Sequence, residues 1–413
     1  MELKTRVTRK IEDIPREDWD SVYPNHLEGY NFFKSLDESK FEQFSFYYIM
    51  VYDGDTALGA AACFSMRYSL DTSISGPIRR AFNFIKKGFP DFLSVKALAC
   101  GSPMDRGSIG MAGRDKTIVA AILKKMEEIA EHEKAPLVAF KDFPHSYSGV
   151  FSILTDNGFF KIDSLPYAEM EVTFGSFDDY LDKLSGASRY DLRRKFRKVD
   201  GAVKIDMEIV AAPDDDTLAD IYSLYIQMLD KHEMTFEIAP KDFFNSVVKN
   251  MPKEAKFFLW RIEGKLAAFL FALTSGDVFI DYYLGLDYEV AYKYHLFFIK
   301  FRDCLKWCIE NKIRRYEIGF SGYEPKKRLG FDFTPLHIYA RHRNRFMNPL
   351  FKILVHFLKF ENFDPDLKKI NLDRGTGEKR PSDIKSIRAD NLKRLARQRS
   401  PVVHEEGARR DRD

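Results

Sequence analysis

Residues 256–285 read KFFLWRIEGKLAAFLFALTSGDVFIDYYLG and carry a dense pattern of apolar and aromatic side chains. Short turns that contain Gly264 and Gly276 divide this stretch into three apolar runs. Runs of this length and composition predict strands, and turns this short join consecutive strands into an antiparallel meander. The predicted strands cover 256–262, 266–274 and 278–285.

A helix and a fourth strand are predicted directly after this meander. Over 291–311, apolar residues such as Phe301, Leu305 and Cys308 recur at the spacing of one helical face. Residues 315–320 then favour a strand. The unit therefore reads as hairpin, strand, helix, strand.

The same order of elements occurs earlier in the chain. The earlier copy has predicted strands over 46–52, 57–66, 95–100 and 137–141, with a helix over 116–132 before the last. Two copies roughly 200 residues apart indicate a duplicated domain. We expect a mixed α/β protein with two tandem domains, each a mixed, mostly antiparallel sheet flanked by helices.

Composition and charge divide the chain further. The 413 residues are 45% hydrophobic and carry a net charge of only +3, which is typical of a globular protein. After residue 366 the chain has 14 Lys and Arg against 8 Asp and Glu, so its positive charge is local. The predicted parts are a first domain over 1–175, a second domain over 176–345, an amphipathic helix with an extension over 346–374, and a disordered basic tail over 375–413.

The cysteines and the apolar runs bear on the compartment. Four cysteines are too few for a disulfide framework in a chain of this size, and they fit a reducing compartment. The charged residues 1–10 do not resemble a signal peptide. The apolar run 266–273 is far short of the roughly 20 residues that span a bilayer. We expect a cytoplasmic protein, with peripheral attachment to the inner face of the membrane as an option.

The second copy resembles a known group of enzymes. The motifs that carry the resemblance are YLGLDYE at 283–289, KYH at 293–295, EIGF at 317–320, KRLGF at 327–331 and the strand 335–341. They are similar to the Fem-type and BioF2-like acyltransferases of the GNAT superfamily, which include proteins of peptidoglycan biosynthesis. The resemblance covers about residues 176–344 in sequence and the first domain mainly by its layout.

This resemblance implies transfer of an acyl or aminoacyl group to an amine. The donor would be an acyl-CoA or an aminoacyl-tRNA, used as a co-substrate, with no tightly bound cofactor. The sequence departs from the GNAT pattern after residue 285, because 286–294 lacks the glycines that let a backbone approach a pyrophosphate. Asp287 and Glu289 would repel a diphosphate unless Lys293 and His295 offset them, so Lys293 is a candidate for donor binding.

The first domain has glycines where the second lacks them. Gly107, Gly110 and Gly113 lie between a predicted strand and the helix over 116–132, where a phosphate-binding loop belongs. This loop is a second candidate for cofactor binding. A glycine-containing connection is also a common turn, so a purely structural role stays open.

Basic residues predict contact with an anionic partner. Arg189, Arg193 and Arg197 recur every fourth residue and would form one cationic ridge on a helix. Such a ridge could hold a tRNA backbone, a lipid diphosphate or an anionic membrane, or it could be a solvated face. DNA is not an expected partner. Lys327, and Tyr339 with Arg341 on a final strand, are further candidates for substrate binding.

Three residues are candidates for proton transfer. Asp281 and Tyr283 lie on the strand that would line the donor cleft, and Glu317 lies on the next strand. Alternation along a strand predicts that Asp281 and Tyr283 share one face, with Tyr282 on the other. Tyrosines that merely fill the sheet surface are the alternative.

Metal chemistry finds no support in the sequence. Cys304 and Cys308 have a spacing that allows metal ligation, but no His or Cys lies near them and both fit an apolar helical stripe. We expect buried structural thiols and no metal site.

Two segments are candidates for a membrane surface. Residues 345–360 combine a wide apolar face with Lys352 and Lys359, so this helix could lie in a membrane interface or dock on the protein's own core. The aromatic and basic stretch 78–92 is a weaker candidate.

Three hypotheses of function remain open. The first is a metal-independent N-acyltransferase or aminoacyltransferase. The second is a catalytically silent tandem-GNAT adaptor that binds a polyanion or a membrane surface. The third is an enzyme that holds ordinary acyl-CoA on the loop 107–113 of the first domain.

Overall fold

The computed structural model describes residues 3–24, 26–69, 94–231, 236–357 and Leu367. These residues all fall within one compact unit, Met1–Leu372. The stretch 78–92 and the predicted tail 375–413 lie outside the described residues, as does the predicted extension after residue 357 except for Leu367.

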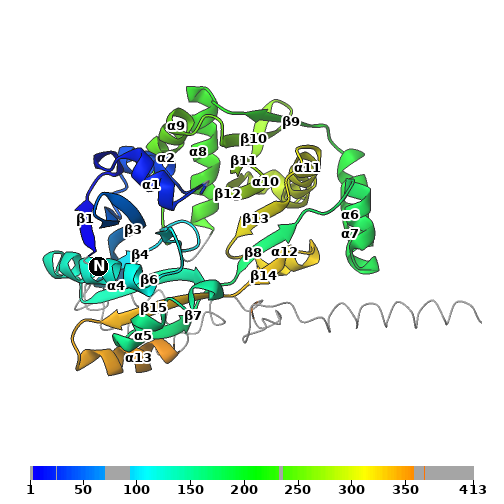
Figure 1. Cartoon of the computed structure of the whole chain (residues 1–413). Helices are drawn as coiled ribbons and strands as arrows, with labels where there is room; N and C mark the ends of the chain where they lie inside the picture. The colour runs from blue at the N-terminus through cyan, green and yellow to red at the C-terminus, as the bar shows by residue number, and fades with distance from the viewer. Residues whose placement is uncertain (1–2, 25, 70–93, 232–235, 358–366, 368–413) are drawn as a thin grey trace, which may run out of the picture. The chain divides into compact units, whose positions relative to one another are not determined.

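The first sheet contains strands from both ends of the chain (Figure 1). Its order is β1-β2-β3-β4-β6-β15-β7, and the short β5 pairs with β3. Its strands are β1 (Lys4–Thr8), β2 (Ser45–Asp53), β3 (Thr56–Ser69), β4 (Ser94–Cys100), β5 (Gly110–Met111), β6 (Leu137–Pro144), β7 (Phe160–Asp163) and β15 (Leu336–His342).

The second sheet has the order β9-β10-β11-β12-β13-β8-β14. The antiparallel meander β10-β11-β12 corresponds to the sequence pattern of residues 256–285. Its strands are β8 (Tyr167–Glu171), β9 (Ile205–Val210), β10 (Ala255–Ile262), β11 (Lys265–Ser275), β12 (Val278–Leu286), β13 (Arg315–Gly319) and β14 (Asp332–Thr334).

The two sheets match each other strand for strand. Each has one parallel pair at the same place in its order, β4 with β6 and β12 with β13. The matching also reveals an exchange: β15 lies between β6 and β7 in the first sheet, and β8 lies between β13 and β14 in the second. The predicted tandem α/β architecture is confirmed, and the division at residue 175 stays a prediction.

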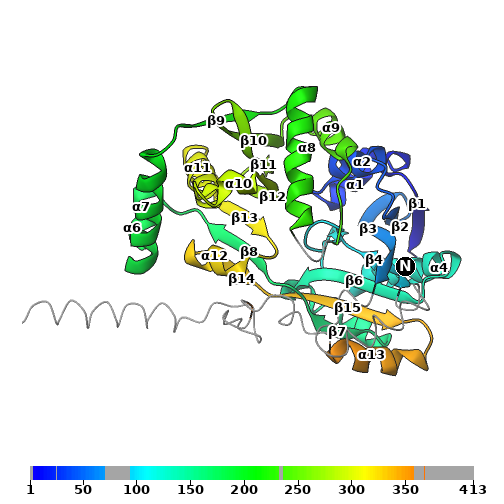
Figure 2. The ribbon, with the colours of Figure 1, turned by 180° about the vertical axis from the view of Figure 1, so that it is seen from behind.

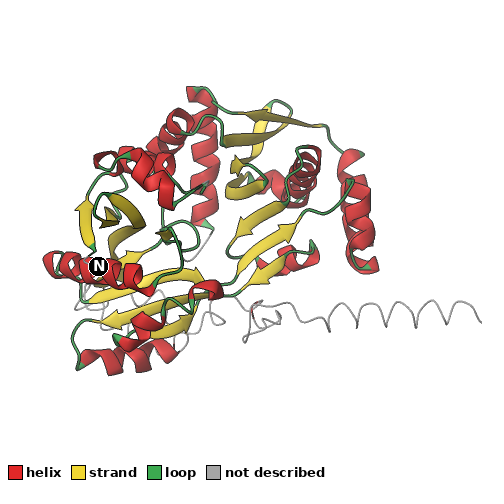
Figure 3. Ribbon diagram, viewed as in Figure 1, coloured by secondary structure: helices red, strands yellow, loops and turns green. Residues whose placement is uncertain are grey.

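Helices cover both sheets (Figure 3). In the first half they are α1 (Arg16–Val22), α2 (Tyr30–Glu38), α4 (Lys116–His132) and α5 (Ser152–Asp156), with 3-10 turns η1 (Ile11–Asp13) and η3 (His145–Tyr147). In the second half they are α6 (Phe177–Lys183), α7 (Gly186–Asp200), α8 (Asp215–Asp230), α9 (Lys241–Asn250), α10 (Tyr288–Ala291), α11 (Leu296–Glu310) and α12 (Tyr323–Arg328). The last helix, α13 (Met347–Phe357), follows β15 and packs on the first sheet, so it belongs to the first half.

Local sequence explains where two of these helices begin. Asp115 caps α4 by accepting a hydrogen bond from the Thr117 N–H, and α4 spans the predicted residues 116–132. The predicted helix over 291–311 is interrupted, because His295 adopts a left-handed conformation and α11 begins only at Leu296.

The two halves share an aromatic core. Helices α2 and α9 pack against each other, and the rings of Phe32 and Phe243 lie 6.2 Å apart there. Both views place α1 and α2 next to α8 and α9 (Figures 1 and 2). Cys304 and Cys308 are free thiols on the buried face of α11, as predicted for structural thiols.

Candidate functional site

The strands β12 and β13 open like a fork. They pair through only three residues of β12, from Val278 to Ile280, and β12 then continues to Leu286 without β13 beside it. A bulge lies just past the fork, because the pairing with β11 leaves Tyr282 as an extra residue. Bulges bend a strand and redirect its side chains, and they are frequent next to active sites.

The bulge changes which side chains share a face. Asp281 faces α11, where it forms an ion pair with Lys300. Tyr283 instead packs in the aromatic core against α8 and α9, with the Tyr225 ring 5.1 Å away. The prediction that Asp281 and Tyr283 share one face is therefore wrong, since the extra residue shifts the alternation.

Asp281 is held in place by buried partners. Its Oδ2 accepts hydrogen bonds from Lys300 Nζ and from the Tyr316 hydroxyl, the latter at 3.0 Å. Asp281 is 8% exposed and Lys300 1%. A carboxylate in a buried ion pair contributes to the fold, and breaking such a pair is strongly destabilising.

Tyr283 lacks such a partner. Its hydroxyl is buried and makes no hydrogen bond within the described part of the chain. Burial, together with the negative charge of Glu237, raises the pKa of Tyr283 well above its ordinary value. The hydroxyl is therefore neutral at physiological pH.

Tyr282 joins a buried carboxylate from the first half. Glu28, in the loop before α2, is 2% exposed. Its Oε1 accepts hydrogen bonds from the Tyr282 hydroxyl and from Ser102 Oγ, the latter at 2.9 Å. Burial and the nearby charge of Asp105 raise the pKa of Glu28 to about 8. A carboxyl group with such a pKa can exchange a proton near neutral pH.

A second cluster surrounds Glu317 in the middle of β13. Its Oε1 lies 2.6 Å from Arg106 Nη2 and 2.7 Å from Arg315 Nε. Its Oε2 accepts a hydrogen bond from the Tyr167 hydroxyl at 3.1 Å. Burial raises the pKa of Glu317, while Arg106 acts against that rise. Glu317 is fully buried, so Arg106, on the first half, is the better exposed member of the pair.

Lys141 lies beside the Glu28 cluster. Its Nζ donates a hydrogen bond to the Ser102 carbonyl at 3.4 Å, lies 5.0 Å from the centre of the Phe236 ring and forms an ion pair with Asp142. Burial raises the pKa of nearby Glu237 to about 8, although Lys141 acts against it. Asp105 links the two clusters, because its charge acts on both Glu28 and Glu317. We call the Glu28 and Glu317 clusters together the joint site.

Sequence reasoning missed most of the joint site. Glu28, Lys141 and the loop that carries Ser102 and Arg106 come from separate parts of the sequence, and no motif marks them as one site. From the sequence, Glu317 is a candidate for proton transfer and Tyr282 lies on the strand expected to line the donor cleft. The signal that could have found the others is three-dimensional, since it depends on how the two halves meet.

The beginning of α11 is surrounded by positive charge. His295 makes no side-chain cap there. Burial, together with Lys195, Lys198 and Arg194 of α7, lowers the pKa of His295. A helix N-terminus and cations favour an anion. The predicted Lys293 precedes this helix start by three residues.

The glycine loop of the first half packs against protein atoms. A Cβ on Gly107 would lie 2.2 Å from the Lys141 carbonyl, and one on Gly110 would lie 2.5 Å from the Tyr23 ring. Tight packing thus explains both glycines. Gly113 has open space around it and precedes Asp115, the cap of α4. Phosphate binding by this loop stays a prediction.

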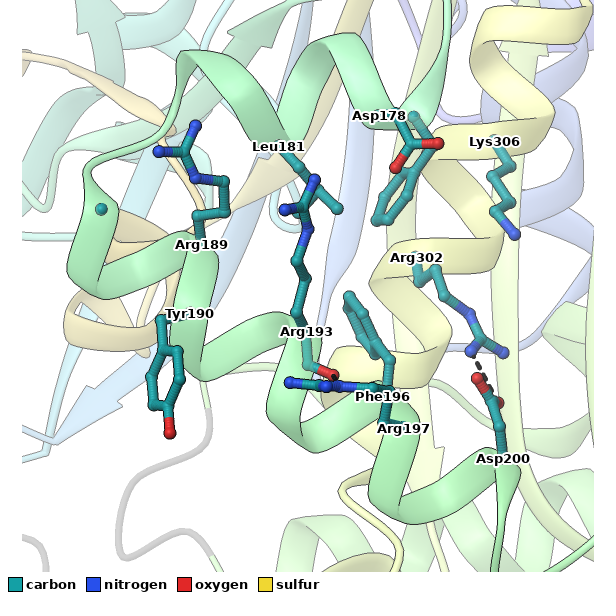
Figure 4. Close-up of a pocket in the computed structure, with 12 residues that line it drawn as sticks. Asp178, Leu181, Arg189, Tyr190, Arg193, Phe196, Arg197, Asp200, Arg302 and Lys306 are labelled. Atoms are coloured by element: carbon teal, nitrogen blue, oxygen red, sulfur yellow. Dashed lines mark hydrogen bonds and ion pairs between the residues drawn. The ribbon is translucent and has the colours of Figure 1, made fainter.

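The arginines of the predicted ridge lie on one face of α7 and line a groove of about 600 Å³ (Figure 4). Arg302 and Lys306 of α11 line the opposite side. Arg189 and Arg193 both approach Oδ1 of Asp182, at 3.3 and 3.6 Å. The other groove residues are Phe177, Asp178, Leu181, Gly186, Tyr190, Phe196, Arg197 and Asp200.

The remaining candidates lie apart from the joint site. Lys327 is exposed on α12. Tyr339 is buried in the first-half core, with the Phe151 ring 5.2 Å away. Arg341 pairs with Glu127 of α4. The structure does not bring these three residues together with Glu317, and their role in substrate binding stays a prediction.

Across the described residues, no group of three or more His, Cys, Asp or Glu side chains could hold a metal ion. Within the same residues, no helix has the length and apolar character needed to cross a bilayer.

Comparison with known families matches the region around the fork to a described domain. Residues 186–328 match the model of the acetyltransferase (GNAT) domain. This matched region includes β12, α11 and β13, so the prediction of a GNAT-type domain in the second half is confirmed. Enzymes with this domain use an acyl-CoA as co-substrate.

Individual relatives are more distant. "Putative 8-amino-7-oxononanoate synthase 2" of Mycobacterium tuberculosis is 24% identical over 329 residues, which cover 76% of this chain and 42% of the relative. The chain thus spans less than half the length of this relative.

Two solved structures share the fold. "Crystal structure of FemX" has a TM-score of 0.55 at 12% identity, covering 84% of this chain and 99% of FemX. The C-terminal domain of a "Putative Lysylphosphatidylglycerol Synthetase" from Agrobacterium fabrum has a TM-score of 0.50 at 11% identity, covering 83% of this chain and 95% of that domain. At such identities the likeness extends to the fold.

Proposed function

We propose that the protein transfers an acyl or aminoacyl group from an activated donor to an amine, without a metal ion. The fork between β12 and β13 is the main support, because it leaves an edge of β12 beside the joint site and lies in the GNAT domain. The donor is an acyl-CoA or an aminoacyl-tRNA, and its acyl group lies along this edge.

The donor's phosphates bind at the start of α11. This helix has no side-chain cap, and Lys195, Lys198 and Arg194 lie close enough to lower the pKa of His295. Their charge counters that of Asp287 and Glu289, which the sequence places nearby. Phosphate groups are favoured where a helix dipole and cations coincide.

The joint site handles the acceptor. An amine arrives as an ammonium and must lose a proton before its nitrogen attacks the donor's carbonyl carbon. This first proton passes to the Tyr282–Glu28 pair. After the attack, the carbon–sulfur bond of a thioester, or the carbon–oxygen bond of an aminoacyl ester, breaks, and the second proton of the nitrogen leaves with the departing thiol or hydroxyl group. Arg106, which stays 27% exposed beside its partner Glu317, donates hydrogen bonds to an anionic acceptor.

Asp281, Tyr283 and Glu317 take supporting positions in this scheme. Asp281 fixes β12 onto α11, and Glu317 orients Arg106. Tyr283 supports the bulge from the core. Alignment of amine and carbonyl supplies much of the acceleration in such reactions, so these positions matter even without proton transfer.

The test compares donors directly. Purified protein is titrated calorimetrically with acetyl-CoA, a long-chain acyl-CoA and a charged tRNA pool, and product is followed by mass spectrometry with small amines, amine lipids and peptidoglycan precursors as acceptors. We expect binding of one donor class and amide formation, both weakened in Lys198→Glu. Failure of every donor to bind or react would contradict the proposal.

An adaptor without activity is the second candidate. The groove of Figure 4 favours it, because five cationic side chains line it against two lining carboxylates, Asp178 and Asp200, with Asp182 beside Arg189 and Arg193 as a third. A polyanion such as RNA would bind this groove with strong salt dependence. Arg193→Glu with Arg197→Glu should then abolish RNA binding while leaving any amide formation from acyl-CoA unchanged; activity with any donor rules out a silent adaptor.

A further inference from the structure

Helix α13 packs on the first sheet through one face. Val355 is 9% exposed and joins a small core with Phe160 and Ala340. The Phe351 ring lies 5.5 Å from that of Phe160. This side of the helix therefore behaves as expected for docking on the protein's own core.

Exposed apolar side chains also gather at this helix. They are among the most exposed large hydrophobic residues of the described chain: Phe346, just before the helix, at 71%, and within it Met347 at 46%, Leu350 at 58% and Ile353 at 58%. Scattered single apolar residues on a surface need no explanation, but a contiguous patch marks an interaction surface. We call these four residues the outer face of α13.

The polar residues beside the outer face are cationic. Helix α13 contains no Asp or Glu. Arg345 and Lys352 are exposed, and neither forms an ion pair with any carboxylate in the described part of the chain. The Arg345 guanidinium lies 4.7 Å from the Phe346 ring centre. By contrast, Arg343 is neutralised by Glu127 at 3.2 Å.

Charge argues against two possible binding partners of this face, a second copy of the protein and the end of its own chain. A second copy of the same face would bring Arg345 and Lys352 against identical charges. The chain after residue 366 has 14 Lys and Arg against 8 Asp and Glu, so it too has the same sign. An anionic lipid surface has the complementary charge, and its acyl region accepts an apolar face.

We propose that the outer face of α13 docks this protein on an anionic lipid bilayer, with its four apolar side chains in the interface and Arg345 and Lys352 at the level of the phosphates. This surface belongs to the first half, whereas the GNAT domain lies in the second. It is therefore independent of the proposed transfer reaction and goes beyond it.

The test uses the full chain in vesicle flotation. Vesicles of phosphatidylglycerol with phosphatidylethanolamine are compared with vesicles of phosphatidylcholine. We expect flotation with the anionic vesicles only, weakened by salt. Leu350→Glu with Ile353→Glu should lower the fraction bound about tenfold or more. Arg345→Glu with Lys352→Glu should remove most of the salt-sensitive part.

A matched control distinguishes binding through this surface from non-specific binding through any exposed apolar residue. Met207 and Ile209 are 40% and 36% exposed on β9, so Met207→Glu with Ile209→Glu makes the same chemical change elsewhere. We expect this control to float like the unsubstituted protein, with circular dichroism unchanged in all variants.

Three outcomes would overturn the proposal. One is no flotation of the unsubstituted protein with anionic vesicles. Another is flotation that survives Leu350→Glu with Ile353→Glu, because the basic end of the chain would then hold the vesicle. The third is a dimer in sedimentation equilibrium that these two substitutions dissociate, which would make the face a contact between copies.

Discussion

The parallel strands of each half part in a fork: β4 ends at Cys100, paired with Phe140, while β6 runs on to Pro144, and β12 runs on past its pairing with β13. The two forks differ in what fills them. In the first half, the chain after β4 turns back into the fork: the Gly101 N–H donates to the Ala62 carbonyl at 3.0 Å and the Gly107 N–H to the Asp142 carbonyl at 2.9 Å. In the second half, β12 bulges at Tyr282 and runs on past β13. Duplication thus gave one fork that the protein closes itself and one that faces the joint site.

The helices that follow the two forks, α4 and α11, differ in how their N-termini are capped. The first N-terminus, on α4, is capped by its own carboxylate, Asp115. The second, on α11, begins at His295 without a side-chain cap and lies near cations of α7. A carboxylate at the cap satisfies an N-terminus that an anion would otherwise occupy. The comparison supports the proposal that the donor binds in the second half and that the matching place in the first half is structural.

The largest effect should come from breaking the buried ion pair between Asp281 and Lys300 beside the second fork. Asp281→Asn leaves Lys300 buried without its counter-charge, so the free energy of unfolding should fall by about 3–5 kcal/mol. Urea denaturation measures this change. Asp281→Leu with Lys300→Met should recover most of the loss, because an apolar pair removes both buried charges.

The alternative role of Asp281 predicts another result. If Asp281 moves the substrate's proton, Asp281→Asn would retain the urea midpoint and lose the transfer reaction. Stability and activity are therefore measured on the same preparation.

The Tyr282–Glu28 pair at the second fork should affect the transfer reaction rather than the stability of the fold. Tyr282→Phe and Glu28→Gln should each lower kcat about 10²- to 10³-fold, because the pair accepts the amine's proton. Tyr283→Phe is the matched control, since its hydroxyl has no partner among the described residues. A larger loss for Tyr283→Phe than for Tyr282→Phe would return the catalytic role to Tyr283.

The pH dependence of transfer follows from the same carboxyl group. Glu28 must be deprotonated to accept a proton, and burial raises its pKa to about 8. Activity should therefore rise as pH increases through about 8 and level off above it. Glu28→Gln should remove this rise, and an unchanged profile in that variant would assign the titration to another group.

Local patterns were sufficient for much of the fold. The meander of residues 256–285 and the helix 116–132 follow from short-range periodicity and capping, which depend only on neighbouring residues. The exchange of β8 and β15 between the sheets was beyond such patterns, because the partner of an edge strand is chosen by contacts far apart in sequence.

The site was less predictable than the fold for a related reason. The helical spacing of Arg189, Arg193 and Arg197 correctly placed them on one face. The bulge at Tyr282 leaves no mark in the local alternation, yet it decides which tyrosine reaches Glu28. The packing of Gly107 likewise depends on Phe143, which is distant in sequence.

A smaller effect distinguishes the two helix starts. Lys198→Glu should weaken donor binding about tenfold, because it reverses a charge near the start of α11. Lys116→Glu makes the same change at the first residue of α4. Calorimetry should give an unchanged dissociation constant for Lys116→Glu, and added salt should narrow the difference between the variants. If both substitutions weaken donor binding equally, the donor site cannot be assigned to the second half.

The smallest expected effect tests the glycine loop of the first half. Gly113→Leu should leave both the melting temperature and donor affinity unchanged, because no atom lies within 4 Å of a Cβ at Gly113. Gly110→Leu should lower the melting temperature, since its Cβ would lie 2.9 Å from the Val22 carbonyl, and for that reason it cannot test binding cleanly. If Gly113→Leu abolishes binding of acetyl-CoA without changing the melting temperature, the donor's phosphates lie on this loop and the first fork, not the second, belongs to the donor site.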